Sequence, residues 1–140
     1  MNRKASAQWK GSLKDGTGIF SVESGAFANV PYSFGRRFEN QPGTNPEELI
    51  AAAHASCFAM ALSSELGKLG ITPVSLDATA TVTFEKTDAG FTITESHLDV
   101  IGKLPAPDAA KWEQATDNAK RGCPISRVLN TKITLTAKLA

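Results

Sequence analysis

The chain has 140 residues, which fits one domain of ordinary size spanning 1–140. Its composition, 41% hydrophobic and 21% charged, is typical of a soluble globular protein. The 15 basic and 14 acidic side chains leave a net charge of +1 without a basic cluster, so no nucleic-acid partner is expected.

The N-terminal segment has basic residues but no apolar stretch behind them, so no signal peptide is expected. The longest apolar-rich run, 49–62, is too short to span a bilayer, and we expect a cytoplasmic protein with no membrane partner. In a reducing compartment Cys57 and Cys123 are not expected to form a permanent structural disulfide. They lie 66 positions apart, and only His54 and His97 could add imidazole ligands, so no metal or other cofactor is expected.

The N-terminal part of the chain is predicted to form strands. Residues 6–24 indicate two strands around the turn KDGTG. Residues 31–40, PYSFGRRFEN, predict a third short strand that begins at Pro31. The loop QPGTNP follows.

A long helix is predicted over 46–69 from signals at both ends. Asn45 is a good N-cap, Pro46 suits the first helical position, and Glu48 completes a capping box. Gly70 marks the end of the helix.

The composition of this helix predicts an oligomer. Between 49 and 62 only His54 and Ser56 are polar, so the helix is apolar around most of its circumference. A domain of 140 residues rarely covers such a helix completely. We therefore expect a homodimer in which a partner covers it.

Two alternating strands follow, over 74–86 and 91–104, joined by the turn TDAG. In the second strand the inward face switches towards Leu98 and Val100, which predicts a β-bulge.

The C-terminal part is predicted to hold two helices and a strand. The first helix ends at Gly122 and is capped by Asp108 or Pro107; a short helix over 123–129 and a strand over 131–140 follow. The order of elements indicates an α+β fold with an antiparallel, meander-like sheet.

Cys57 allows two interpretations. On a helix it shares a face with small or apolar residues, among them Ile50, Ala53 and Ala61. A free cysteine in such surroundings often acts as a small core hydrophobe. The alternative is a reactive thiol.

Cys123 precedes Pro124 and so occupies the cap of a new helix, where the helix dipole favours a thiolate. Lys120 and Arg121 add positive charge nearby. Local reasoning therefore makes Cys123 the more acidic thiol, although an incidental cap residue is the alternative.

Two cysteine-centred stretches, PYSFGRRFENQPGTNPEELIAAAHASCFAMAL and AKRGCPISRVL, resemble the OsmC/Ohr family, and its osmotically inducible branch in particular. The resemblance covers nearly the whole chain. It implies an intertwined homodimer, with antiparallel sheets packed around two long central helices and two sites at the subunit interface. The implied activity is a thiol-dependent peroxidase that protects against oxidative and osmotic stress.

The resemblance also implies roles for four residues. Cys57 is expected to be the peroxidatic cysteine and Cys123 the resolving one, while Arg37 polarises the site and Glu47 orients it. Around the helix Glu47 lies about 80° from Cys57 and Glu48 about 180°, so only Glu47 is on the thiol's half.

The choice between the two arginines rests on the resemblance. On a strand, Arg36 and Arg37 would point to opposite faces, which separates them without selecting one. His54, about 60° from Cys57, suggests a cysteine hydrolase, but i, i+3 geometry on one helix rarely aligns base and nucleophile. Packing or an interface hydrogen bond is the favoured role for His54.

Two alternatives to a peroxidase stay open. One is a non-enzymatic redox sensor or apolar-ligand-binding dimer, which would consume peroxide stoichiometrically. The other is a hydrolase that uses Cys57 and His54, whose ester turnover would be insensitive to substitution of Cys123. Neither the preferred peroxide nor the external dithiol, of lipoyl or thioredoxin type, follows from the sequence.

Overall fold

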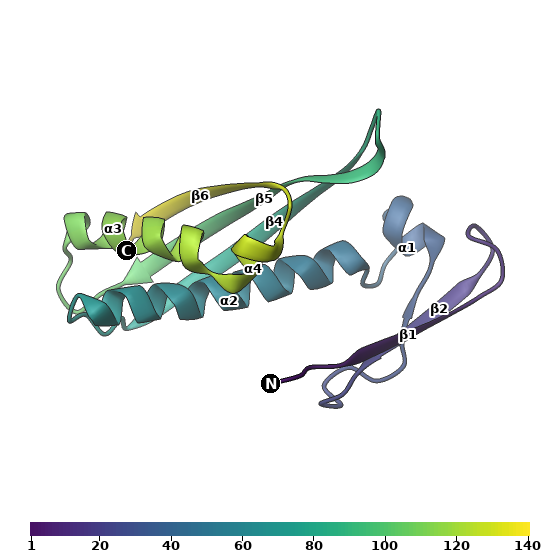
Figure 1. Ribbon diagram of the computed structural model, residues 1–140, viewed down its shortest axis with the longest axis horizontal. Helices are drawn as coiled ribbons and strands as arrows, with labels where there is room; N and C mark the ends of the chain where they lie inside the picture. Colours follow the sequence, from purple (N-terminus) through teal and green to yellow (C-terminus); the bar gives the residue numbers. More distant parts are fainter. The chain divides into compact units, whose positions relative to one another are not determined.

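The computed structural model describes residues 1–140, in two compact units, Met1–Leu49 and Ile50–Ala140 (Figure 1). Helix α2, Pro46–Lys68, begins in the first unit and continues through the second. Each unit is described by itself. That the two form a single domain stays a prediction.

The first unit contains an antiparallel sheet of three strands in the order β1–β2–β3. They are β1 Ala5–Lys10, β2 Thr17–Val22 and β3 Val30–Tyr32. The two strands and the turn predicted over 6–24 are confirmed. Glycine is required at Gly18, because a Cβ there would lie 2.5 Å from the Tyr32 ring.

The strand predicted over 31–40 is wrong after Tyr32, because the chain enters the short helix α1, Phe34–Phe38. Ser33 caps this helix by accepting a hydrogen bond from the Arg36 N–H. Phe34 and Phe38 fit a strand alternation, but they are also four residues apart, and their rings make a tilted contact with centroids at 4.7 Å. The argument from strand faces for Arg36 and Arg37 therefore does not apply.

The second unit contains a sheet in the order β4–β5–β6. Its strands are β4 Ser75–Thr87, β5 Gly90–Lys103 and β6 Lys132–Leu139. β4 and β5 are antiparallel, but β6 runs parallel to β5, which corrects the expected all-antiparallel meander. The α+β class holds, and the sheet is mixed because helices between β5 and β6 carry the chain back to the same end of the sheet.

The predicted bulge in β5 is confirmed at Thr94. Thr83 pairs with Glu95, whereas the next residue, Phe84, pairs with Ile93, so Thr94 is the extra residue. Beyond the bulge the inward face carries the buried residues Ser96, Leu98 and Val100.

Helix α2 begins at Pro46, as predicted, and ends at Lys68, one residue before the predicted end. The Asn45 side chain accepts from the Glu48 N–H at 2.8 Å, whereas the Glu48 carboxylate accepts from the Thr44 hydroxyl instead of closing a capping box. At the C-terminus, Gly70 has φ +75° and Ile71 N–H bonds to Leu66 C=O, the pattern of a Schellman motif.

One stripe of α2 forms the core of the second unit. The buried side chains Phe58, Leu62 and Leu66 pack with Leu98 and Val100 of the sheet, beside which α2 runs in Figure 1. The helix α3, Ala109–Gly122, capped by Asp108, adds Trp112, Ala115 and Ala119 to this core.

The opposite stripe of α2 is uncovered in the single chain. Ala52, Ala53 and Met60 are exposed, Met60 at 76%. By length and composition alone, α2 as a whole could cross a membrane, although the narrower run 49–62 is too short; the core helix of a soluble protein meets the same criterion. The exposed apolar stripe is what a dimer partner would cover, and the dimer stays a prediction.

Candidate functional site

The two cysteines meet inside the second unit. The Sγ atoms of Cys57 on α2 and Cys123 lie 2.9 Å apart, and both are free thiols. Cys123 is fully buried, whereas Cys57 is half-buried and packs against the core cluster. Side chains 66 positions apart in the sequence thus form one thiol pair.

Cys123 is placed by the junction between two helices. α3 ends at Gly122, and the short helix α4, Pro124–Val128, begins immediately afterwards. A residue before proline is pushed towards extended backbone, and Cys123 has φ −55° and ψ 124°. Its N–H still bonds to Ala119 C=O at 2.9 Å, which fixes the turn from which the thiol reaches Cys57.

The start of α4 serves Cys57 rather than Cys123. The Cys123 side chain makes no capping hydrogen bond, whereas the Ile125 backbone N–H bonds to the Cys57 thiol. Arg121, expected to add charge near Cys123, pairs with Asp117 at 3.1 Å, and its side chain is 68% exposed. The start of the helix, which was expected to favour a thiolate at Cys123, therefore acts on Cys57 instead.

The electrostatics of Cys57 favour the neutral thiol in this unit. Burial raises the pKa of Cys57, and the bond with Cys123 raises it further. The Ile125 N–H lowers this pKa but does not outweigh burial. A reactive thiolate at Cys57 thus needs an additional positive charge.

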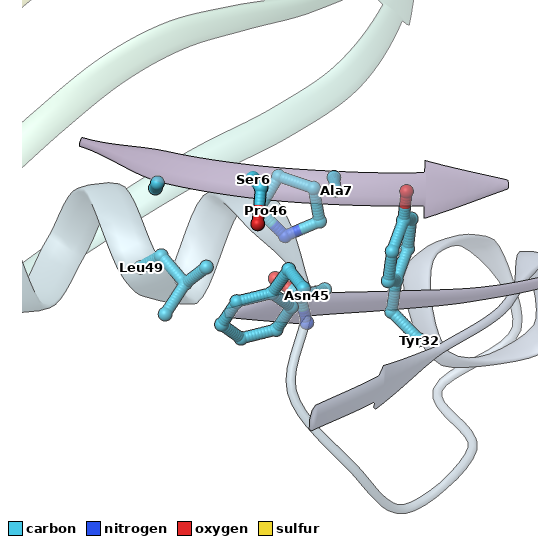
Figure 2. Close-up of a pocket in the computed structure, with 8 residues that line it drawn as sticks. Ser6, Ala7, Tyr32, Asn45, Pro46 and Leu49 are labelled. Carbon is cyan, nitrogen blue, oxygen red and sulfur yellow. The ribbon is translucent and has the colours of Figure 1, made fainter. Parts of the chain in front are cut away.

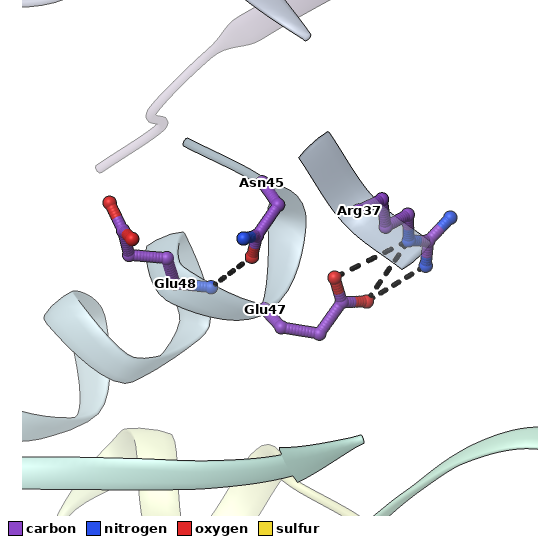
Figure 3. Close-up of polar contacts among 4 residues, drawn as sticks. All are labelled: Arg37, Asn45, Glu47 and Glu48. Carbon is purple, nitrogen blue, oxygen red and sulfur yellow. Dashed lines mark hydrogen bonds and ion pairs between the residues drawn. The ribbon is translucent and has the colours of Figure 1, made fainter. Parts of the chain in front are cut away.

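The first unit holds a charged pair, Arg37 and Glu47 (Figure 3). Arg37 Nη2 and Nε donate to Glu47 Oε1 at 2.8 and 3.2 Å, and Nε is 3.3 Å from Oε2. The Glu47 side chain is only 10% exposed, whereas that of Arg37 is 38% exposed. The carboxylate thus anchors a guanidinium that keeps an accessible side.

The neighbouring residues of the same types have other partners. Arg36 Nη1 donates to the Pro31 carbonyl at 2.6 Å, so it makes a local backbone contact. The Glu48 backbone is held by Asn45, and its carboxylate points away from Arg37 (Figure 3). The geometry thus distinguishes Arg37 from Arg36, which the sequence pattern alone did not.

His54 is fully buried and has both ring nitrogens occupied. Nδ1 is 2.7 Å from Ser96 Oγ, and Nε2 is 2.8 Å from Ser126 Oγ. Burial lowers the pKa of His54, so the ring is neutral near pH 7. Because both nitrogens bond to serine hydroxyls, His54 is not arranged as a base for Cys57. The expected packing role fits its full burial, whereas its hydrogen bonds are to residues of the same chain, so the expected interface hydrogen bond stays a prediction.

Comparison with known proteins gives the family. Residues 38–138 match the family described as OsmC-like protein. The chain belongs to the OsmC-like family. It is 49% identical to Peroxiredoxin OsmC of Escherichia coli (strain K12) over 139 residues, covering 99% of this chain and 97% of that protein.

The chain is also similar to two more distant proteins, one by sequence and one by fold. The chain is 32% identical to an organic hydroperoxide resistance protein of Xanthomonas axonopodis pv. citri (strain 306) over 100 residues, 70% of this chain and 68% of that one. The fold matches the crystal structure of the organic hydroperoxide resistance protein OhrB of Bacillus subtilis, with a TM-score of 0.72 over 98% of each chain and 24% identity.

Two hollows lie in the first unit of this OsmC-like chain. A cavity of about 290 Å³ has mainly apolar walls, including Phe20, Tyr32 and Leu49, and Figure 2 shows Tyr32 and Leu49 at its sides. A second, of about 190 Å³, contains Arg37; its other walls are Trp9, Leu13, Tyr32, Ser33, Phe34 and Phe38. Only the second places a charged side chain against apolar ones.

Some features of this OsmC-like site escape sequence reasoning. Phe58, the residue after Cys57 on α2, is fully buried in the core and is unavailable to a ligand. Ser96 and Ser126, the partners of His54, were not foreseen. The available signal for Ser96 was its position in register with Leu98 and Val100, on the inward face of β5. No group of three or more His, Cys, Asp or Glu side chains is arranged to hold a metal ion.

Proposed function

We propose that this chain is a thiol-dependent peroxidase that reduces organic hydroperoxides and hydrogen peroxide, and so protects the cell against oxidative and osmotic stress. The observation that carries the proposal is the contact of two free thiols at 2.9 Å, one half-buried and one fully buried. The family, and relatives named Peroxiredoxin OsmC and organic hydroperoxide resistance protein, support it.

The proposed reaction uses Cys57 first and Cys123 second. The Cys57 thiolate attacks the terminal peroxide oxygen, and a sulfur–oxygen bond forms as the oxygen–oxygen bond breaks. The departing oxygen takes a proton from the solvent and leaves as an alcohol or water, and Cys57 becomes a sulfenic acid. The Cys123 sulfur then displaces the oxygen of the Cys57 sulfenic acid, which gives a disulfide and water. An external dithiol of lipoyl or thioredoxin type reduces the disulfide by exchange.

Arg37 is proposed to supply the charge that Cys57 lacks. Burial raises the pKa of Cys57, and a guanidinium is positively charged at any physiological pH. Glu47 would hold Arg37 in a fixed direction through their charge-assisted hydrogen bonds. The apolar hollow beside Arg37 suits the alkyl group of an organic hydroperoxide, with the peroxide oxygens at the guanidinium.

We further propose that the site forms in a homodimer. Glu47 and Cys57 are ten residues apart on α2, and helical rise alone separates them by about 15 Å along the axis. The Arg37–Glu47 pair would therefore serve the partner subunit's Cys57, with the exposed apolar stripes of two α2 helices packed together. A cytoplasmic location fits this scheme, because a reducing compartment returns the thiols to their reduced state.

Steady-state kinetics test the proposed function. The reduced protein is mixed with hydrogen peroxide or an alkyl hydroperoxide, and with dihydrolipoamide or a thioredoxin system as reductant. Many turnovers per Cys57 are expected, and none in Cys57→Ser. Consumption of one peroxide per thiol pair with every reductant would instead indicate a redox sensor or an apolar-ligand-binding dimer.

A further inference from the structure

A series of side-chain hydrogen bonds centred on the buried His54 connects three elements of the second unit. His54 of α2 bonds to Ser96 of β5 through Nδ1 and to Ser126 of α4 through Nε2. His54 and Ser96 are both fully buried. The bond to Ser96 is buried and the bond to Ser126 is partly buried. Because a hydrogen bond shielded from water is costly to break without a replacement partner, these two bonds help to fix the position of α4 relative to α2.

Apart from the junction with α3 at Cys123, whose N–H bonds to Ala119 C=O, helix α4 has little else to hold it. It has only five residues and none of them is buried, Val128 being 73% exposed. Its apolar anchor is the partly buried Ile125. The bond from Ser126 to His54 is therefore the polar attachment of a helix that carries only a small apolar contact.

The same short segment carries two groups that reach Cys57. Cys123, at the cap of α4, places its thiol 2.9 Å from Cys57 Sγ, and the Ile125 N–H bonds to the same sulfur. Ser126 is the next residue after Ile125, and His54 precedes Cys57 by three positions on α2, roughly one turn. The Ser126–His54 hydrogen bond and the thiol pair thus both connect α4 to α2.

We propose that His54 is a positioning residue for disulfide formation, acting through Ser126 to hold Cys123 against Cys57. This rests on the proposed function. In the step concerned, an electron pair of the Cys123 sulfur forms the bond to the Cys57 sulfur, and the Cys57 sulfur–oxygen bond breaks. The departing oxygen leaves as water after taking the Cys123 thiol proton. His54 and Ser126 touch none of the reacting atoms.

The proposal predicts a change in the fate of the Cys57 sulfenic acid. Each reduced variant receives one equivalent of an alkyl hydroperoxide in the presence of a 1,3-diketone that traps sulfenic acids, and intact mass gives the ratio of disulfide to adduct. The disulfide and the adduct both arise from the Cys57 sulfenic acid of the folded protein. A loss of stability alone therefore lowers the yields of both products equally and leaves their ratio unchanged.

Ser126→Ala should shift this ratio towards the adduct on the order of 10-fold, because a displaced reactant loses much of its advantage of proximity. Ser126→Thr, which keeps the hydroxyl, should restore the ratio. The matched control is Thr134→Ala, which removes a similar hydroxyl contact, 2.6 Å from His97 Nδ1, and should leave the ratio unchanged.

An unchanged ratio in folded Ser126→Ala overturns the proposal. If that variant does not fold, Ser96→Ala takes its place, since it frees the His54 ring from β5 and should shift the ratio in the same direction; an unchanged ratio there also overturns it. A wild-type protein that forms neither disulfide nor adduct would instead overturn the proposed function itself.

Discussion

The Ile125 backbone N–H bonds to the Cys57 sulfur, while the neighbouring Cys123, which caps the same helix, makes no such bond. Burial still raises the pKa of Cys57 above its ordinary value, so one N–H donor does not produce a thiolate. The remaining stabilisation has to come from a cation, and this requirement leads to the first prediction.

Arg37→Met should slow the attack of Cys57 on peroxide on the order of 100-fold, the effect of losing a charge-stabilising donor of about 3 kcal/mol. Arg36→Met should have much less effect, because Arg36 bonds to the Pro31 carbonyl. Stopped-flow measurement of the first oxidation compares the two. Equal effects of the two substitutions would show that the assignment to Arg37 is wrong.

The roles of the two thiols can be distinguished by the intact mass of wild type and of each cysteine variant after one equivalent of peroxide. Cys57→Ser should not react, because the attacking atom is absent. Cys123→Ser should react at a similar rate to wild type but gain oxygen at Cys57 instead of forming a disulfide, and excess peroxide should overoxidise it. Wild type should lose two hydrogen atoms. Oxidation of Cys123 in Cys57→Ser at the wild-type rate would reverse the two roles.

Local sequence signals predicted the elements well where one interpretation was available. The capping side chain of Asn45 and the alternation along 74–86 both led to the observed helix and strand. They failed at α1, because Phe34 and Phe38 satisfy a strand pattern as well as a helical i, i+4 contact.

Features that depend on residues far apart in the sequence were harder to predict from the sequence. The direction of β6 depends on the path of the chain through α3 and α4, which a strand pattern does not contain. The contacts of His54 join residues 42 and 72 positions away, so periodicity offers no signal for the pairing itself. For the site residues, motif resemblance named both thiols, Arg37 and Glu47, and the geometry agrees with that choice by pairing Arg37 rather than Arg36 with Glu47. Their roles stay predictions.

The dimer can be tested on the exposed stripe of α2. Met60→Glu should weaken dimerisation, because Met60 is 76% exposed in the single chain and would be covered by a partner helix. Val74→Glu is the matched control, since Val74 is 61% exposed and lies outside α2. Sedimentation at micromolar concentration should show a dimer for wild type and the control. A stable, folded wild-type monomer would exclude the proposed dimer.

The last prediction concerns pH and His54. Burial lowers the pKa of His54 from 6.5, so below that pH the unfolded chain binds a proton that the folded protein does not. The free energy of unfolding should therefore decrease as pH falls from 6.5 towards the lowered pKa, by at most about 1.4 kcal/mol per pH unit from this group. Well above pH 6.5 the ring is neutral in both states and contributes no slope. Urea denaturation of the reduced protein across this range should show a smaller slope for His54→Gln than for wild type. Identical slopes in His54→Gln and wild type would mean that the buried ring accepts a proton as readily as it does in the unfolded chain.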